Sequence, residues 1–475
     1  MKSRIVSKNK VSSTGERVSL RIPLATVNAL HEQGSAQREH VSREAHGEWE
    51  PAQNREDIIS MMKKSNVGRQ KHLIPLRMQR MASSPFAFLR GAAAVMAYDL
   101  AQTPVMGSNV VLAGDAHISN FGFYGTAQRE LVFDINDFDE TIVGPWEWDL
   151  KRLTASVNVA GRENGLSQKE RRSAVMQAVE GYQQNMQRLE SMGTLDIWYL
   201  HASPGRADVL RKVPPKASAV MRKVTEKALQ SDNHNLLKKV ADKDAKGQWR
   251  FREDPPVLTR ISASLQNKLV TALEDYSLTL SRERRYMLSR YRVADVAHRV
   301  VGVGSVGTRA YLALLIGKND GDPLFLQIKE ASTPAHGPNL PLRRAEFVNE
   351  GQRVVVGQRA LQASSDVMLG WTEMDGRPYY VRQMKNLKAD VPIEWMSGDA
   401  FTFYCWACGA LLARAHARTS EAATIAGYCG ASRVLRQSLA KWAEAYGNQT
   451  IRDHAKLLEA VKSGEFGEVL PNVRD

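Results

Sequence analysis

Apolar and polar positions divide the chain into long helical stretches and a shorter part rich in strands. Helical periodicity marks residues 55–101, 148–161 and 167–192, and it returns beyond residue 385. Between residues 291 and 385, apolar runs separated by turn signals predict three strands, a helix at about 342–363, and two more strands. The pattern therefore predicts an α+β protein whose strands gather in one lobe.

Composition divides the chain further. Residues 1–55 are polar and poor in aromatic side chains, which predicts a flexible or loosely docked arm. We expect a helical lobe over residues 56–285, a β-rich lobe over 286–395, and a C-terminal helical segment, 396–475, that completes the larger lobe. Ser84 and Pro85 predict the start of one helix that runs to about residue 101. On that helix, Arg90 is open to two interpretations, a phosphate contact or a surface ion pair.

The net charge of +14 and the pI near 9.6 favour polyanionic partners such as nucleotides or nucleic acid. The most basic stretch, residues 205–260, is expected to be helical with mobile turns. It lacks interleaved aromatic residues, so a solvated face is favoured over a nucleic-acid surface there. No apolar run has the length of a membrane span, and the N-terminus lacks the apolar core of a secretory signal. Three cysteines indicate a reducing compartment, so we expect a cytoplasmic protein of bacterial type in which Cys405 and Cys408 pack on one helix face.

Two short apolar runs lead into a cluster of oxygen-bearing side chains. Residues 110–112 are followed by Gly114-Asp115-Ala116-His117-Ile118-Ser119-Asn120, and residues 131–133 are followed by the acids Asp134, Asp137, Asp139 and Glu140. A base, an amide oxygen and a carboxylate at one end of a hairpin-like unit suit Mg²⁺, which completes its coordination shell with substrate phosphates. The alternative is that these side chains only cap turns.

A second group of residues surrounds the glycine-rich stretch VGVGSVG at 301–307. Gly302, Gly304, Ser305 and Gly307 would let the backbone approach phosphates closely. A dinucleotide-binding loop is followed by a helix, but here residues 309–317 continue as a strand. A glycine-rich loop between two strands is the arrangement that covers ATP phosphates in protein-kinase-like enzymes.

That interpretation requires a lysine on a following strand and an acid on the next helix. Lys329 directly follows residues 325–328 in a predicted apolar strand, where burying an unpaired lysine is energetically costly. Glu346 and Glu350 are the acids that the next helix offers, and spacing does not choose between them. The alternative is an edge-strand lysine that points to solvent.

Both groups of residues resemble parts of kinase-like phosphotransferases of the aminoglycoside-phosphotransferase type. Residues 114–120 match the G-D-x-H-x-x-N loop of those enzymes, and residues 136–139 resemble their second metal-binding motif. The resemblance implies a catalytic role for Asp115 and metal ligation by Asn120 and Asp137, with Asp134 and Asp139 as competitors for the metal. Asp149 is expected to hold the loop, and residues 412–417 resemble the helix that precedes it. His117 would contact substrate or make a structural hydrogen bond in the loop.

Over residues 55–430 the chain also resembles an uncharacterised bacterial family called domain of unknown function 2252. The resemblance rests on the stretches SPFAFLRGAAAVMAYDLA, GDAHISNFG, FDINDFDET, GPWEWDLKRL, GVGSVGTRAY, QIKEA and GQRVVVGQRALQ. It implies a kinase-like fold without an established substrate. Because the glycine-rich stretch and Lys329 follow the catalytic loop here, we expect a circularly permuted, protein-kinase-like two-lobe fold with extra helices.

The expected function is Mg²⁺-dependent phosphoryl transfer from ATP to an unknown hydroxyl acceptor, a small molecule or a protein. AMP transfer and a nucleotide-binding pseudokinase are the alternatives within this fold. A metal-dependent phosphoesterase is a weaker alternative, because His298, His336 and His416 lack the sequence context of such sites. A basic scaffold that binds nucleic acid through residues 205–260 is the non-enzymatic alternative, with Lys238 and Lys239 as its contacts.

Overall fold

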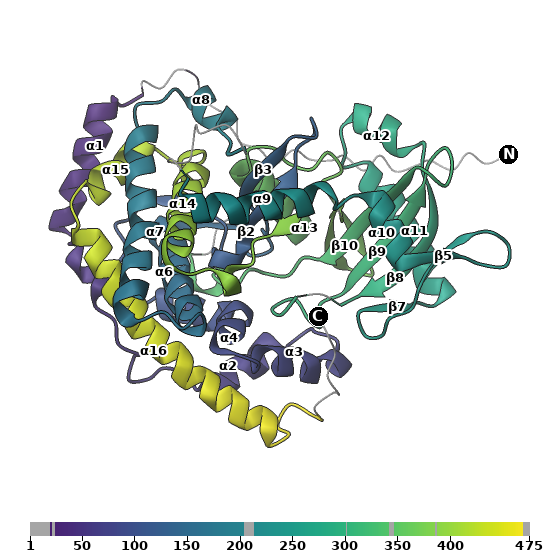
Figure 1. Ribbon diagram of the computed structural model, residues 1–475, viewed down its shortest axis with the longest axis horizontal. Helices are drawn as coiled ribbons and strands as arrows, with labels where there is room; N and C mark the ends of the chain where they lie inside the picture. Colours follow the sequence, from purple (N-terminus) through teal and green to yellow (C-terminus); the bar gives the residue numbers. More distant parts are fainter. Residues whose placement is uncertain are drawn as a thin grey trace, which may run out of the picture.

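The computed structural model describes residues 20, 24–203, 213–300, 302–341, 346–384 and 387–468. A large lobe of helices lies on the left in Figure 1, and a smaller lobe built on an antiparallel sheet lies on the right. Helices and antiparallel sheets are therefore combined in one chain, as the hydrophobic pattern predicts.

The core of the large lobe is formed by α6 (Trp146–Glu163), α7 (Gln168–Leu189), α14 (Gly398–Ala417), α15 (Ala422–Cys429) and α16 (Val434–Lys462). Helices α7 and α14 approach closely because each has a glycine at the crossing. A Cβ atom on Gly409 would lie 1.9 Å from the carbonyl oxygen of Ala178, and one on Gly181 would lie 2.1 Å from that of Trp406. Cys405 and Cys408 are free thiols buried on α14, which confirms their packing role.

Helices from the N-terminal part of the chain cover one side of this core. They are α1 (Val27–Ala36), α2 (Ile58–Ser65), α3 (Ile74–Met81), α4 (Pro85–Gly91) and α5 (Ala93–Leu100). The single helix expected over residues 84–101 is wrong, because the backbone leaves helical geometry at Ala92 and starts again. Ser84 does cap α4, since its hydroxyl accepts a hydrogen bond from Ala87 N at 3.1 Å.

The segment 24–55, predicted as a loosely docked arm, is instead packed onto the large lobe. Helix α1 crosses α15 so closely that a Cβ atom on Gly427 would lie 2.1 Å from the carbonyl oxygen of His31. The ring of Trp49 packs edge-on against Trp442, with 5.5 Å between centroids. The polar composition of this segment therefore did not predict the few apolar contacts that hold it on the large lobe. Residues 1–19 and 21–23 of the predicted arm lie outside the described residues.

The small lobe is a six-stranded antiparallel sheet with the order β11-β12-β10-β9-β8-β7. Its central part confirms the predicted order of three strands, a helix and two strands: β8 (Arg292–Arg299), β9 (Ala310–Ile316), β10 (Pro323–Glu330), α13 (Glu350–Leu361), β11 (Gly370–Met374) and β12 (Arg377–Gln383). The sheet also includes β7 (Leu258–Arg260), which pairs with β8.

The lobe begins earlier than the predicted boundary at residue 286. One face of the sheet packs on α11 (Ala263–Ser277), with α12 (Arg282–Leu288) following, and the other packs on α10 (Asn233–Val240) and the hairpin β5 (Ala241–Lys243)–β6 (Trp249–Phe251). Strand residues alternate between these faces. Ile328 therefore joins the α11 side, and Phe325 joins the α10 side. The stretch 213–260, expected to be helical, contains the short strands β5, β6 and β7 as well as helices. Its apolar residues pack against β9 and β10 of the sheet.

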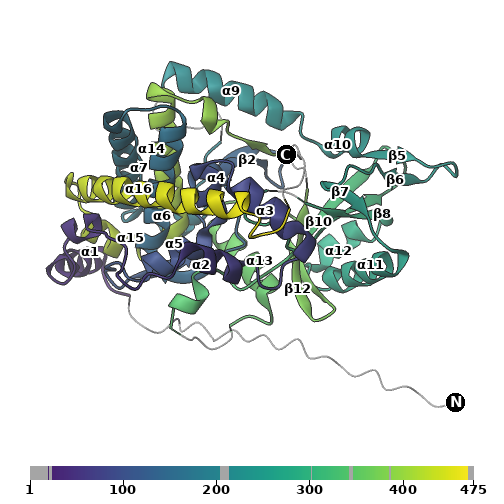
Figure 2. The same cartoon turned by 90° about the horizontal axis from the view of Figure 1, so that it is seen from below.

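Short strands of the large lobe carry the candidate catalytic segments between them. They are β1 (Asn109–Leu112), β2 (Phe121–Gly125), β3 (Leu131–Ile135) and β4 (Ile142–Pro145). After β12 the chain returns to the large lobe through β13 (Ala389–Asp390), which pairs with β2. Helix α9 (Pro215–Leu229) runs from the large lobe toward the sheet (Figure 2), and α8 (Thr194–Tyr199) precedes it. The candidate catalytic loop thus lies where the two lobes meet.

Candidate functional site

The loop between β1 and β2 is held by a carboxylate from α6. Asp149 accepts hydrogen bonds from Ala113 N at 2.7 Å and Gly114 N at 3.0 Å. The Nε2 atom of His416, on α14, lies 3.1 Å from the same carboxylate. Gly114 has φ +78°, and a Cβ atom there would lie 2.0 Å from the carbonyl oxygen of Glu140. As predicted, Asp149 holds the loop, and the end of α14 supports it.

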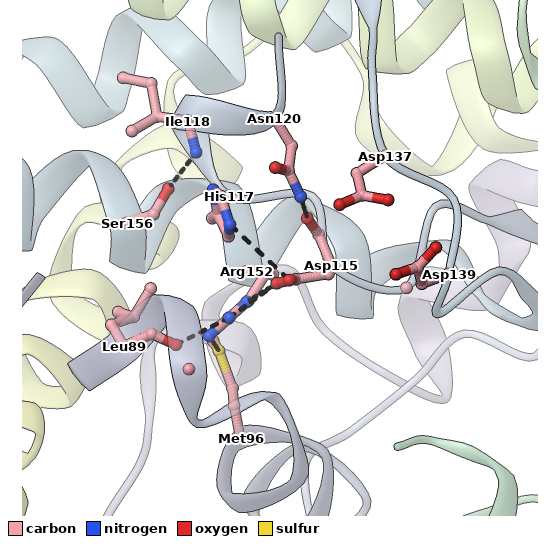
Figure 3. Close-up of polar contacts among 12 residues, drawn as sticks. Leu89, Met96, Asp115, His117, Ile118, Asn120, Asp137, Asp139, Arg152 and Ser156 are labelled. Atoms are coloured by element: carbon pink, nitrogen blue, oxygen red, sulfur yellow. Dashed lines mark hydrogen bonds and ion pairs between the residues drawn. The ribbon is translucent and has the colours of Figure 1, made fainter. Parts of the chain in front are cut away.

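Asp115 is joined to an arginine that the sequence did not single out. Arg152 donates from Nε at 2.8 Å and from Nη2 at 2.7 Å, both to Oδ1 of Asp115 (Figure 3). Burial raises the pKa of the Asp115 carboxyl, but the charge of Arg152 and these hydrogen bonds outweigh burial and lower that pKa below its usual value. Asp115 is therefore an ionised carboxylate whose second oxygen faces His117.

His117 is a buried, neutral histidine. Its Nε2 atom lies 3.7 Å from Oδ2 of Asp115, and burial lowers its pKa to about 3. Within the described part of the chain, its Nδ1 atom has no hydrogen-bond partner. The ring packs edge-on against Phe86, with centroids 6.4 Å apart. A neutral imidazole in this place can make a hydrogen bond to a substrate without adding charge.

Asn120 and Asp137 both line the cavity that contains Asp115 (Figure 3). The side-chain amide of Asn120 donates to the carbonyl oxygen of Asp115 at 2.7 Å, which turns its oxygen away from that bond. Asp137 accepts from Phe138 N at 3.0 Å through Oδ1. Burial raises the pKa of Asp137, but the nearby charges of Lys329 and Arg382 outweigh burial and lower that pKa.

The two competing acids have other partners. Asp134 is buried and forms an ion pair with Arg414 of α14, at 2.5 Å between Nη2 and Oδ1. Asp139 forms an ion pair with Lys329 and accepts a hydrogen bond from the Tyr380 hydroxyl at 2.6 Å. Of the three acids, Asp134 and Asp139 each form a direct ion pair. Asp137 forms none within the described residues, and cations that line the cleft stabilise its charge from a longer distance.

Lys329 lies on β10, opposite Tyr380 of β12, and points into the cleft between the lobes. Burial alone would lower its pKa, but the charges of Asp137 and Asp139 outweigh burial and raise it, so the ammonium is retained. The expected partner on the following helix is not the one that the structure provides. Glu350 pairs with Arg353, and Glu346 lies exposed before α13. A loop of the large lobe supplies the acid instead.

The glycine-rich loop between β8 and β9 reaches the same cleft. Gly302 and Gly307 have φ +74° and +89°, the left-handed values that favour glycine. Gly302, Gly304 and Ser305 line the cavity with Asp115 and Lys329, whereas Gly307 does not line it and accepts a hydrogen bond from Gln70 N at 2.8 Å. The first residue of the stretch, at position 301, lies outside the described residues.

Two adjoining cavities form the cleft. The first, of about 620 Å³, holds Asp115, His117 and Asn120. The second, of about 450 Å³, lies toward β12 and β13 and is lined by polar side chains such as Gln358 and Arg382. They share four lining residues, which come from both lobes: Asp137, Gly302, Ser305 and Lys329. Volumes of this size accommodate a nucleotide and a small second ligand.

Glu140, the last acid of the cluster in the sequence, also lines the first cavity, although the sequence predicted no separate role for it. One of its oxygens accepts from Ala335 N at 2.5 Å. Burial, helped by the nearby charge of Asp115, raises the pKa of Glu140 to about 7. Arg152 could have been found from the sequence, because it lies one helical turn beyond Asp149 and shares its face. The raised pKa of Glu140 could not be predicted, since loops distant in the sequence form its environment.

The donor set fits a hard cation that is bound mainly by its substrate. Asn120 and Asp137 offer one amide oxygen and one carboxylate, a set that suits Mg²⁺ with phosphate oxygens and water as further ligands. Among the residues that the structure describes, no group of three or more histidine, cysteine, aspartate or glutamate side chains is arranged to hold a metal ion. The site therefore does not offer a cation an all-protein coordination shell.

A family model described as "Uncharacterized protein conserved in bacteria (DUF2252)" matches residues 69–460, which include the candidate catalytic loop, the glycine-rich loop and Lys329. Neither a curated protein nor a solved structure matches the chain. Across the described residues, no helix is both long enough and apolar enough to cross a membrane.

Proposed function

The chain belongs to this uncharacterised bacterial family, and we propose that it is a Mg²⁺-dependent phosphotransferase that moves the terminal phosphoryl group of ATP to a hydroxyl acceptor. One observation carries the proposal: Asp137 from the large lobe and Lys329 from the small lobe, far apart in sequence, line the same cleft beneath the glycine-rich loop.

The order of elements in the small lobe supports a kinase-like interpretation. A strand, a glycine-rich loop, a strand, a lysine-bearing strand, a helix and two strands follow one another from β8 to β12. This is the order in the small lobe of protein kinases. The catalytic loop precedes this lobe in the chain, so the proposed fold is a circularly permuted one in which β13 connects the end of the small lobe to the strand after that loop.

In the proposed reaction, the nucleotide lies toward the second cavity, and its phosphates extend past Lys329 and the backbone of the glycine-rich loop. Lys329 contributes positive charge, which Asp139 fixes in place. Bound Mg²⁺ would be held by Asn120 and Asp137 and would neutralise charge on the phosphates. Catalysis of this kind depends mainly on positioning and charge stabilisation.

The acceptor oxygen then forms a bond to the terminal phosphorus while the bond to the bridging oxygen breaks, and ADP leaves. The acceptor proton passes to the free oxygen of Asp115 and afterwards to solvent. Because Arg152 lowers the pKa of Asp115, this carboxylate is a weak base. We therefore propose that Asp115 orients the acceptor hydroxyl and takes its proton late in the reaction. A weak base is enough for this, because the transition state of phosphoryl transfer is loose.

Nucleotide titration with and without Mg²⁺ tests the proposal. Wild type should bind ATP more tightly with Mg²⁺, and Lys329→Ala and Asp137→Asn should each weaken Mg·ATP binding about tenfold or more, since each removes a charged contact. Lys318→Ala and Asp275→Asn change exposed residues of the same types and should leave the affinity unchanged. Equal affinity in wild type, Lys329→Ala and Asp137→Asn would refute the assignment.

A further inference from the structure

The first cavity is closed on one side because the glycine-rich loop is docked on the large lobe. Arg69 donates to the carbonyl oxygen of Val306 at 2.7 Å, and Arg80 donates to that of Gly302 at 2.8 Å. Val303 and Val306 are buried in two small apolar clusters with residues of α2, α3 and α4. The loop therefore forms a roof fixed at its tip, and the space beneath it suits a small molecule better than a polypeptide.

Arg90, on α4, lines this cavity and differs from the arginines around it. The guanidinium of Arg77 donates hydrogen bonds to Asn66 Oδ1 at 2.7 Å and to the carbonyl oxygen of Gly91 at 2.9 Å. Arg90 makes no hydrogen bond or ion pair with any residue in the described part of the chain, and its Nε atom is completely buried. An ion pair at the protein surface, one of the two interpretations offered by the sequence, is thus not formed there.

A guanidinium with its donors unused at the wall of a cavity favours an anionic ligand. Five N–H groups in a planar fork match the oxygens of a carboxylate or a phosphate, and desolvated unpaired charge is costly. Next to Arg90, and close enough for its charge to lower the pKa of His117, lies the imidazole with the unpartnered Nδ1 atom. One cationic fork and one neutral ring atom would recognise an anionic group and a polar group of the same molecule.

We propose that this half of the cavity is the acceptor subsite, and that the acceptor is a small hydroxylated molecule whose carboxylate or phosphate pairs with Arg90. The assignment of an acceptor rests on the proposed phosphotransferase function. The anion site itself rests only on the cavity, on Arg90 and on His117. Asp115 lines the same cavity as Arg90 and Lys329, so we place the hydroxyl of an acceptor held by Arg90 next to Asp115.

Binding of inorganic phosphate and of acetate, each without nucleotide, tests the site. Apparent affinities come from the rise of the thermal unfolding midpoint with ligand concentration. At least one anion should bind wild type and lose about tenfold in affinity in Arg90→Gln, because the charged fork is gone. Phosphate preference would indicate a phosphorylated acceptor, and acetate preference a carboxylate. Arg222→Gln, an exposed arginine on α9, should match wild type.

Three results would overturn the acceptor subsite: neither anion binds wild type, Arg90→Gln binds both as wild type does, or the loss occurs in Lys329→Ala instead. If Arg90→Gln does not fold, Arg90→Lys keeps the charge without the fork and should still weaken binding about threefold. Anion binding that depends on Arg90, together with nucleotide binding that ignores Mg²⁺, would leave the anion site standing and refute the phosphotransferase. The opposite combination would refute the subsite alone.

Discussion

At the scale of single residues, the surroundings of two carboxylates in one cavity make them chemically different. Arg152 keeps Asp115 ionised, whereas burial and neighbouring acids raise the pKa of Glu140 to about 7. The sequence indicated Asp115 and Asn120 through a local motif, whereas the preference for Asp137 over Asp134 and Asp139 rested on the family resemblance. It could not predict that Lys329 pairs with Asp139, since that contact joins a strand of the small lobe to a loop of the large lobe.

Breaking the Asp115–Arg152 pair should cost more than a surface ion pair does. Arg152→Ala is expected to lower the free energy of unfolding by about 3 kcal/mol, since it leaves a carboxylate desolvated without its partner. Chemical denaturation measures this. In the double variant with Asp115→Asn the loss should be smaller than the sum of the two single losses. Strict additivity would mean that the pair is not coupled.

Glu140 should make stability depend on pH near neutrality. Its pKa is raised from 4.5 to about 7 on folding, so the folded protein holds a proton that the unfolded chain releases. The contribution of this proton to the free energy of unfolding is complete below about pH 4.5 and is lost as the pH rises through 7. Denaturation at pH 5 and pH 8 should therefore show that Glu140→Gln gains stability over wild type at the higher pH only. A constant difference at both values would contradict this.

At the scale of elements, the glycine-rich loop is the feature that sequence and structure describe differently. The alternation of apolar runs correctly predicted strands on both sides of it. The docking of the loop onto the large lobe was not predictable. It depends on Arg80 of α3 and on Arg69 in the segment after α2, and nothing in the local sequence marks these arginines as partners of the loop. The same limit applies to α4 and α5: Ser84 and Pro85 predicted where α4 begins, but the break at Ala92 was not predicted.

Shortening Val306 should loosen the docked loop. Val306→Ala removes two methyl groups from a small buried cluster with Leu73 and Leu76, which costs roughly 1.5 kcal/mol at about 0.8 kcal/mol per group. Hydrogen exchange of residues 302–308 should become faster by about tenfold, while that of β9 and β10 is unchanged. Exchange as slow as in wild type would show that the apolar contact does not hold the loop.

At the scale of the whole molecule, parts distant in sequence share one framework. Residues 24–55 cover α15 and α16, and the small lobe begins with α10 rather than at residue 286. Composition alone missed both facts, because a few apolar residues in a polar stretch decide where it packs. The overall division into a helical lobe and a β-rich lobe was predictable, since it follows from the periodicity of long segments.

The N-terminal segment should therefore contribute to global stability. Trp49→Ala is expected to cost about 2 kcal/mol, because the ring packs on Trp442 and Tyr446. Trp395→Ala is the matched control, as that ring is 82% exposed and should be near neutral. Thermal unfolding compares the two variants. Equal midpoints for both would mean that residues 24–55 are not part of the cooperative fold.

The central claim is that the large and small lobes supply one phosphate and metal site. The most direct test is a crystal structure with a non-hydrolysable ATP analogue and Mn²⁺ in place of Mg²⁺, in which anomalous scattering locates the metal. Mn²⁺ should lie between the side chains of Asn120 and Asp137, with the analogue's phosphates next to Lys329 and the glycine-rich loop. Nucleotide or metal bound outside this cleft would contradict it.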